Sequence, residues 1–250
     1  MIGTNSAVLA AAGGSGGNGS ANEGGSQAAV VAALREGLVG YWPLDETSGN
    51  VANDHSGNGN HGTLQGGISL AQNGVIDGEN SMQFNGNGRI NIPNSNSIRI
   101  PDFSASLWIS TPNVNQVWGM PFTKSNDSTA GSWEIRLHNN QGRIEFRSKT
   151  PDTSTIHTVL LSNNNWHHIA VVKQGTNATI WLDGVEGPTQ TNFYSTANPT
   201  INYLIGARNP NSPAHFFNGL IDEVALWDRP LTSQEIQSLY NSGQALSLIQ

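Results

Sequence analysis

Hydrophobic and polar residues alternate in short segments from residue 37 onward. Such alternation over four to eight residues is typical of strands with one buried face. The segments are residues 38–44, 81–84, 89–92, 103–110, 116–123, 133–137, 143–147, 166–173 and 178–182. Turn residues between the last two pairs predict antiparallel hairpins. About a dozen strands with no helix between them predict an all-β, antiparallel two-sheet sandwich.

A further strand is predicted near the C-terminus, in the segment GLIDEVALWDRP at residues 219–230. Side chains alternate between the two faces of a strand, so Leu220, Asp222 and Val224 share one face while Glu223 lies on the other. Each face then carries one carboxylate among apolar residues. We expect Asp222 to be buried and to need a partner.

Two short helices are predicted, one at each end of the chain. Residues 27–36, QAAVVAALRE, contain good helix formers with apolar residues on one side. Near the C-terminus, Thr232 and Glu235 form a T-x-x-E capping box, and Gly243 is the expected end of that helix.

The N-terminal residues 1–26 are mostly Ala, Gly, Ser and Asn. Such a segment buries too little apolar surface to offset its ordering entropy, so we expect a flexible arm. Residues 27–36 are then a connector, and residues 37–250 a single domain. The connector either docks on its own domain or becomes ordered on a partner.

Composition narrows the classes of function. The net charge of −7, with no basic run, argues against nucleic acid as a partner. No cysteine is present, which excludes disulfides and thiolate metal sites. No apolar run is long enough to span a bilayer, and the N-terminus lacks a convincing secretory signal. We therefore expect no membrane partner.

Seven segments occur in an order that resembles one family. They are GLVGYWPLDETSG (37–49), DHSGNGNHGTL (54–64), MQFNG (82–86), FSASLWI (103–109), NNWHHIAVV (164–172), IWLDGV (180–185) and GLIDEVALWDRPLTSQEI (219–236). Together they resemble the laminin-G-like, concanavalin A-like lectin/glucanase jelly-roll family. The resemblance implies two curved antiparallel sheets, with the first and last strands adjacent and a short helix packed at the end.

The resemblance also implies a structural calcium ion that ties the first strand to the last through an Asp of the G-x-I-D-E strand. Asp222 matches that position, and nearby oxygen ligands suit a hard cation. In the alternative, Asp222 accepts backbone N–H bonds or pairs with Arg89 or Arg229. The candidate metal ligands are Asp222, Asp45, Asn85 and Gly86.

Catalysis is not expected. The related laminarinase-type glucanases carry an E-x-D-x-x-E pattern, which this sequence lacks. Glu134 is isolated among apolar neighbours, and Glu145 is flanked by Arg143 and Arg147, which would keep it ionised. Glycosidases need two carboxyl groups close together, one of them a proton donor. The sequence therefore predicts a protein that is not an enzyme.

Aromatic residues in or next to less regular segments are candidate sugar contacts, because sugar rings stack on exposed aromatic faces. Tryptophans inside strand patterns are expected in the core instead: Trp42, Trp108, Trp166, Trp181 and Trp227. The candidate ligand-binding residues are Trp118, Phe193, Tyr194, Phe216 and Phe217.

Two functions fit these features. The first is a structural or adhesion module on a virion surface, such as a phage capsid decoration, head-fibre or tail protein. Residues 1–36 would anchor it to the particle or to neighbouring subunits, including copies of itself, and the jelly roll would be displayed. The alternative is a secreted or cell-surface lectin domain that binds a glycan. Both place the protein outside the cell or on a particle.

Overall fold

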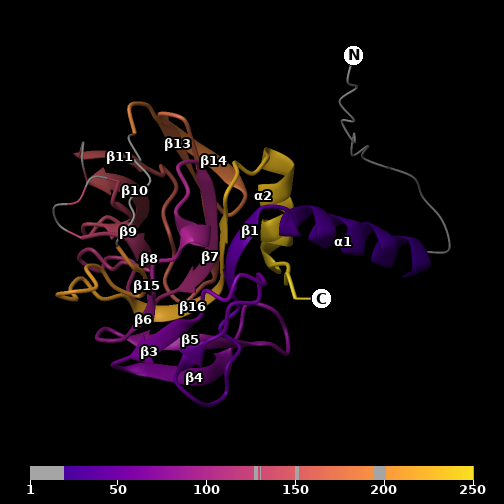
Figure 1. The fold of residues 1–250 in the computed structure, drawn as a ribbon, viewed down its shortest axis with the longest axis horizontal. Coiled ribbons are helices and arrows are strands. Elements are labelled where there is room, and N and C mark those ends of the chain that lie inside the picture. Colours follow the sequence, from indigo (N-terminus) through magenta and orange to yellow (C-terminus); the bar gives the residue numbers. More distant parts are fainter. Residues whose placement is uncertain (1–19, 127–128, 130, 150–151, 194–200, 250) are drawn as a thin grey trace.

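Two antiparallel sheets packed face to face form the body of the protein in the computed structural model (Figure 1). The structure describes residues 20–126, 129, 131–149, 152–193 and 201–249, with residues 20–26 described by their backbone alone. The two-sheet jelly-roll sandwich expected from the alternation pattern is confirmed. Within this part of the chain, no helix combines the length and apolar character needed to cross a membrane.

Sheet A lies between sheet B and the helices (Figure 1). Its strands run in the order β14, β13, β12, β7, β16, β5 and β4, and β1 pairs with β16. Their bounds are β14 Val185–Gln190, β13 Asn177–Leu182, β12 His167–Gln174, β7 Phe103–Ser110, β16 Asn218–Trp227, β5 Asn80–Asn85, β4 Ile68–Asn73 and β1 Leu38–Trp42.

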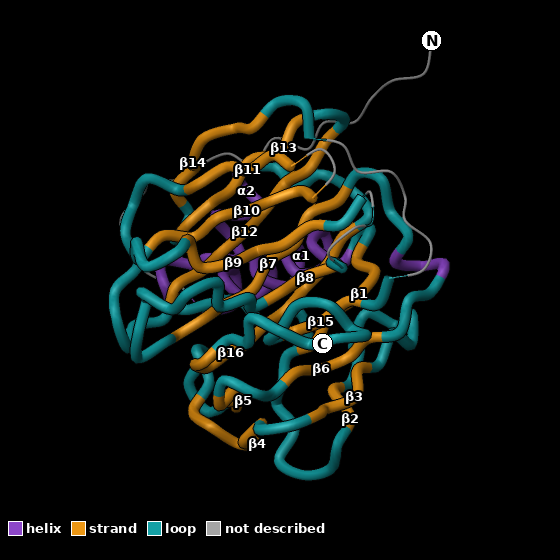
Figure 2. The backbone as a smooth tube through the Cα atoms, turned by 90° about the vertical axis from the view of Figure 1, so that its left-hand side faces the viewer, coloured by secondary structure: helices purple, strands orange, loops and turns teal. Residues whose placement is uncertain are grey.

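Sheet B forms the other layer and faces the viewer in Figure 2. Its strands run in the order β11, β10, β9, β8, β15, β6, β3 and β2. Their bounds are β11 Asp152–Ile156, β10 Arg143–Lys149, β9 Trp133–His138, β8 Phe122–Lys124, β15 Tyr203–Ile205, β6 Arg89–Ile92, β3 Gly62–Gln65 and β2 Val51–Ala52.

Alternation on the strands creates the core between the sheets. On β9, Trp133, Ile135 and Leu137 point into this core, where they meet the inward side chains of sheet A. Trp133 packs against Phe103 of sheet A, with ring centroids 5.0 Å apart. The intervening residues of β9 are charged or polar and lie on the outer face of sheet B. That face carries the candidate site.

Strand β16 closes the sandwich because it pairs with β7 on one side and with β5 and then β1 on the other. The expected adjacency of the first and last strands is confirmed. Strict alternation along β16 was a wrong expectation, since Ile221, Val224 and Leu226 all lie in the interior core. A bulge between Asp222 and Ala225, with Glu223 at φ 52°, shifts the phase of the strand.

Two helices cover the outer face of sheet A. Helix α1 spans Ser20–Arg35, and α2 spans Ser233–Tyr240. The first helix therefore begins before residue 27, inside the segment expected to be a flexible arm. Residues 1–19 of that arm lie outside the described residues. Val31 and Leu34 of α1 are buried with Trp227 of β16 and with Ile236 and Leu239 of α2.

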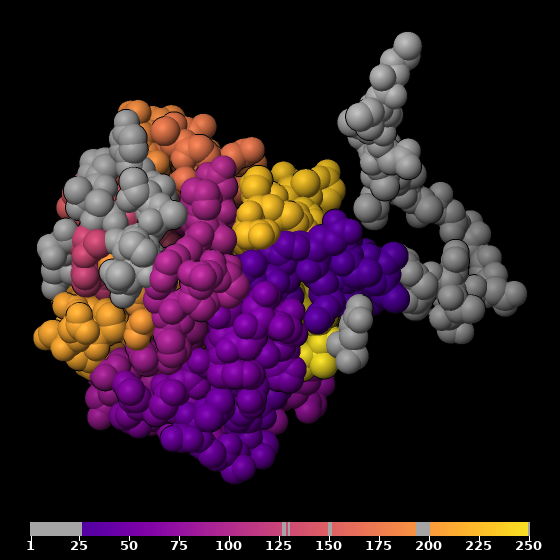
Figure 3. All heavy atoms as spheres, in the orientation of Figure 1, coloured from indigo at the N-terminus to yellow at the C-terminus, as the bar shows by residue number. Residues whose placement is uncertain are grey.

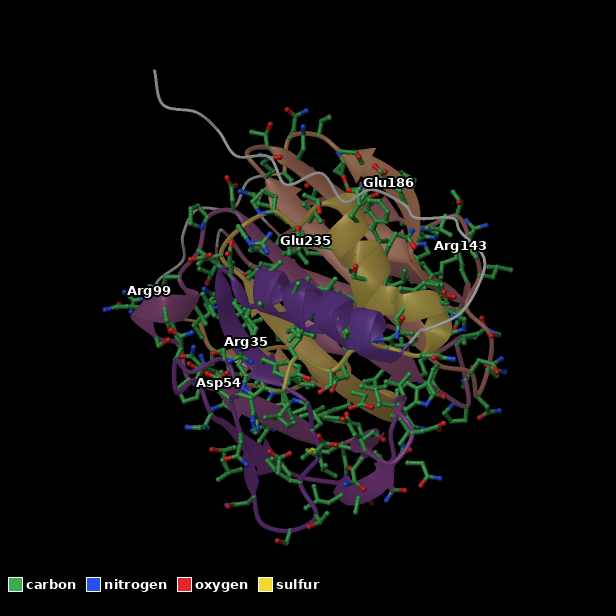
Figure 4. All side chains as sticks on the ribbon, turned by 90° about the vertical axis from the view of Figure 1, so that its right-hand side faces the viewer. Arg35, Asp54, Arg99, Arg143, Glu186 and Glu235 are labelled. Atoms are coloured by element: carbon green, nitrogen blue, oxygen red, sulfur yellow. The ribbon has the colours of Figure 1, made fainter. Side chains whose placement is uncertain are left out.

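The C-terminal end of α1 is fixed to the domain by hydrogen bonds. The Trp227 indole N–H donates to the Leu34 carbonyl at 2.6 Å, and Arg35 donates to the Leu248 carbonyl at 2.6 Å. Figure 4 shows α1 and α2 over the same side of the sandwich, with Arg35 labelled, and in Figure 3 the described part of α1 lies beside α2. In the structure, residues 27–36 dock on their own domain, which is one of the two alternatives expected for this connector.

Helix α2 begins as expected. Thr232 accepts a hydrogen bond from the Glu235 backbone N–H, and the Glu235 side chain accepts one from the Thr232 N–H, which completes the capping box. The helix ends earlier than expected, because Asn241 already adopts the left-handed conformation at its C-terminus, two residues before Gly243. Asn tolerates that conformation better than most residues.

Candidate functional site

Strands β9 and β10 lie in the sheet that faces the viewer in Figure 2. Their outward residues form rows of charged side chains on the outer face of sheet B. In the antiparallel register Glu134 lies opposite Arg147, and Arg136 lies opposite Glu145. Opposite charges therefore face each other across the two strands. All four side chains project away from the apolar core, because they alternate with the inward residues of each strand.

Arg136 joins the two glutamates of this face. Its Nε and Nη2 atoms donate to the Glu145 carboxylate at 3.0 and 2.9 Å, and its Nη1 donates to Glu134 at 3.4 Å. Glu134 is fully buried and has two further cations, Lys149 and Arg208, each at 3.6 Å from its Oε1. The expectation that Glu134 is isolated was wrong, because apolar neighbours in sequence point to the opposite face of the strand.

Glu145 is held in its ionised form. Its burial would raise the pKa, but hydrogen bonds from Arg136 and His138 outweigh burial and lower the pKa below its usual value. The ionised state agrees with the sequence-based expectation, although the partners differ. Arg147 instead binds Asp152, and its Nε donates to the Asp152 carboxylate at 2.6 Å.

A pocket of about 180 Å³ opens above these ion pairs. Trp118 is half-buried at its rim, and the Arg136 guanidinium lies 4.1 Å from the centre of the indole ring, in a cation–π contact. Trp118 has φ 57° and His215 has φ 53°, a region that bulky residues rarely adopt. Such strain is concentrated at functional sites. The lining residues are Trp118, Met120, Arg136, Arg147, Arg208 and His215.

Of the aromatic residues expected to bind a ligand, only Trp118 lines this pocket. Phe193 is 1% exposed and stacks on Phe146 in the core, and Phe217 is fully buried. Their assignment as ligand contacts was wrong, because irregular backbone can still direct a ring inward. Phe216 is half-buried outside the pocket lining, and Tyr194 lies outside the described residues.

The tryptophans expected in the core follow the prediction with one exception. Trp42, Trp108, Trp181 and Trp227 are buried. Trp166 is half-buried and precedes β12. It offers a tryptophan outside the pocket lining for comparison with Trp118.

The candidate metal ligands are only partly brought together. Asp222 accepts hydrogen bonds from the backbone N–H groups of Val75, at 2.8 Å, and Glu223, at 3.0 Å. This is one of the alternatives that the sequence left open, and neither Arg89 nor Arg229 is its partner. Burial, together with the charges of Asp45 and Glu79, raises the pKa of Asp222 to about 8.

Asn85 and Gly86 are not part of this acidic group. Asn85 pairs with Asn218, whereas Asp222 lies one residue beyond the Ile221–Met82 pair. Four residues of strand separate the two positions, which is about 13 Å at 3.3 Å per residue. Placing Asn85 and Gly86 among the calcium ligands was therefore wrong.

A cation would suit the remaining acidic residues in charge. The charges of Asp45 and Glu79 raise the pKa of Asp222, and the charge of Asp45 raises the pKa of Glu79. A hard cation would favour the ionised forms and offset the cost of burying them. Even so, among the described residues no group of three or more His, Cys, Asp or Glu side chains is arranged to hold a metal ion.

Glu223, next to Asp222, takes a different partner. Its Oε2 accepts a hydrogen bond from the Tyr41 hydroxyl at 2.6 Å. Burial raises its pKa well above the usual value, and the Asp222 charge acts in the same direction. The cavity beside it measures about 10 Å³, which is room for about one water molecule. A sugar cannot reach Glu223 through this cavity.

Sequence reasoning missed most of the pocket. The alternation in RIEFR could have placed Glu145 on the outer face with Arg147. Arg208 and His215 come from the irregular segment between β15 and β16. No sequence pattern indicates that this segment lies close to β9 and β10. Trp118 was expected within a strand spanning residues 116–123, but β8 covers only Phe122–Lys124.

Several solved structures are similar to this fold. One is domain 4 of AbnA, a GH43 extracellular arabinanase from Geobacillus stearothermophilus, in complex with arabinotriose. Its TM-score is 0.68 at 20% identity, over 83% of this chain and 98% of that chain. Another is the binding domain of Paraclostridial Mosquitocidal Protein 1, with TM-score 0.64 at 22% identity, over 84% of this chain and 53% of that chain.

A third similar structure is that of botulinum neurotoxin type C, whose cell entry depends upon interaction with two ganglioside molecules. Its TM-score is 0.65 at 16% identity, over 85% of this chain and 52% of that chain. This chain thus spans about half of each toxin structure. At these identities the likeness concerns the fold.

A search of curated proteins found no match. A family model does match residues 84–237, which run from the end of β5 to the second turn of α2. With the closure by β1 and β16 and the capped C-terminal helix, the chain belongs to the concanavalin A-like lectin/glucanase superfamily.

Proposed function

We propose that this protein is a non-enzymatic glycan-binding module and that its ligand binds at the pocket of Trp118 on the outer face of sheet B. The observation that carries the proposal is the pocket itself, which combines one half-buried indole with several fixed hydrogen-bond donors. Sugar recognition needs this combination of an aromatic face with directed polar groups. The arabinotriose complex of a similar fold supports the same class of ligand.

Binding without hydrolysis follows from the chemistry of the two glutamates. A glycosidase requires one carboxyl group with a raised pKa that donates a proton to the leaving group. Glu145 has a lowered pKa and is bound through both oxygens by Arg136. Glu134 is fully buried beneath Arg136. Both residues position the arginine and neither is available as an acid.

The test is a glycan array probed with the full chain, followed by titration calorimetry on the glycan that binds best. Trp118→Ala should weaken that binding by about tenfold or more, since loss of stacking on one aromatic ring costs about 1–2 kcal/mol. Trp118→Phe, which keeps a ring, should retain part of the affinity.

Trp166→Ala is the matched control, because Trp166 is also half-buried but lies outside the pocket lining. Melting temperatures of all variants are measured to confirm folding. If Trp166→Ala weakens binding as much as Trp118→Ala does, the glycan does not bind at this pocket. If no glycan on the array binds, the proposed function is wrong.

We also propose that residues 1–36 attach the module to a particle or to a neighbouring subunit. The support is the direction of α1, whose N-terminal end points away from the sandwich (Figure 1). Limited proteolysis distinguishes the alternatives. Cleavage before residue 27 should be suppressed in the native assembly compared with the free chain. Equal cleavage in both samples contradicts attachment through this segment.

A structural calcium ion at Asp222 and Asp45 is a further proposal, supported by the raised pKa of Asp222. The two residues would hold the ion beside β16, and the ion would compensate their charge. Its test is the pH dependence of stability described in the Discussion.

A further inference from the structure

We infer that the glycan bound at the Trp118 pocket is an acidic sugar, whose carboxylate or sulfate group is held by Arg147 and Arg208. This inference rests on the proposed function and names the class of ligand for the same site. It follows from how the charges are layered around the pocket.

The outer face of sheet B is richer in cations than the net charge of the chain suggests. The chain has 11 Lys and Arg residues against 18 Asp and Glu, so a cationic surface is unexpected. Yet the ion pairs across this face join four of those 11 cations to three carboxylates among the described residues. The cations are Arg136, Arg147, Lys149 and Arg208, and the carboxylates are Glu134, Glu145 and Asp152.

The carboxylate and guanidinium side chains on this face differ in how exposed they are to solvent. The Glu134 and Glu145 side chains are 0% and 3% exposed, while those of Arg147 and Arg208 are 21% and 13% exposed. These two carboxylates therefore form the floor, and the guanidinium groups line the pocket. The Asp152 side chain is 57% exposed, but Asp152 is not among the residues that line the pocket.

The cations on this face also repel one another electrostatically. Burial lowers the pKa of Lys149, and the positive charges of Arg147, Arg208 and Arg136 lower it further, although Glu134 opposes them. Cations that disfavour a neighbouring ammonium are stabilised by an added anion. Guanidinium groups also match carboxylate and sulfate oxygens in planar, two-point hydrogen bonds.

The size of the pocket limits what can enter. At about 180 Å³ it is smaller than the roughly 300–1,000 Å³ of sites that enclose a drug-sized molecule. It suits a single sugar unit, with the ring against Trp118 and the acidic group toward the arginines. The rest of the chain of sugars would lie outside.

The experiment compares ligands that differ only in charge, by titration calorimetry with the full chain. Oligogalacturonate is compared with its methyl ester, and dextran sulfate with dextran. We expect the acidic member of at least one pair to bind about tenfold or more tightly. The pair that shows the difference distinguishes carboxylate from sulfate recognition.

Three variants locate the effect. Arg147→Gln and Arg208→Gln should each reduce the affinity for the acidic sugar by about tenfold. Asp152→Asn should increase it, because Asp152 occupies the Nε donor of Arg147. Arg99→Gln is the control, since Arg99 is exposed and projects from a distant edge of the sandwich (Figure 4).

Several results would overturn the inference. If acidic and neutral sugars bind equally, glycan binding stands and the acidic specificity is wrong. If Arg99→Gln weakens binding as much as Arg208→Gln, the preference is only a diffuse charge effect, which salt would also remove. If neither these sugars nor any glycan on the array binds, both the inference and the proposed function fail.

Discussion

At the scale of single residues, the partners of a buried ionisable group decide whether it is charged. Glu145 and Asp222 are both buried carboxyl groups, yet their pKa values move in opposite directions. Glu145 has Arg136 and His138 as partners, whereas Asp222 has backbone N–H groups and the nearby charges of Asp45 and Glu79. Glu145 on sheet B is thus held in its ionised form, whereas Asp222 on β16 requires a bound proton or a nearby cation.

The raised pKa of Asp222 predicts how stability depends on pH. In the presence of EDTA, folded Asp222 retains a proton up to about pH 8, while an unfolded Asp releases it near pH 4. The free energy of unfolding should therefore fall by about 2 kcal/mol or more between pH 5 and pH 8. Asp222→Asn should reduce this fall. Calcium should also reduce it in the native sequence, because a bound cation favours the carboxylate.

Urea unfolding at both pH values, with EDTA or calcium, provides the measurement. Asp77→Asn is the matched control, because Asp77 is exposed in the same segment between β4 and β5. An equal fall in Asp222→Asn and in the unaltered chain would contradict the origin assigned here. A fall that calcium leaves unchanged would contradict the calcium site.

At the scale of elements, local sequence patterns predict strands and helix caps. They do not predict which distant segments come together or where the backbone is strained. The alternation in WEIRL and RIEFR correctly predicts β9, β10 and their pairing. The segment before β8 was expected to be a strand, but Trp118 adopts a positive φ there. The bulge at Glu223 likewise had no signal, since Glu rarely adopts φ 52°. At both positions the unusual backbone conformation changes the direction of a side chain, that of Trp118 before β8 and that of Glu223 in β16.

The capping box of α2 allows a quantitative test of such a local pattern. Thr232→Ala removes the side-chain acceptor for the Glu235 N–H and should lower the free energy of unfolding by about 1 kcal/mol. Ser238→Ala, in the same helix but away from the cap, should change it by less than about 0.5 kcal/mol. Urea unfolding measures both. Equal effects of the two substitutions would mean that the cap does not stabilise the protein.

At the scale of the whole molecule, the outer faces of the two sheets differ in what covers them. The outer face of sheet A is covered by α1, α2 and the C-terminal segment, which bury an apolar cluster. The outer face of sheet B carries the charged pocket and Trp118. We therefore propose ligand binding on sheet B and attachment on the helical side.

An experimental structure of the full chain with its best-binding glycan tests that central claim most directly. We predict one sugar ring against the Trp118 indole, with the Arg147 and Arg208 guanidinium groups within hydrogen-bond distance of its acidic group. A glycan bound instead on the helical side of sheet A, or at the rim beside Asp222, with the Trp118 pocket empty, would contradict the account.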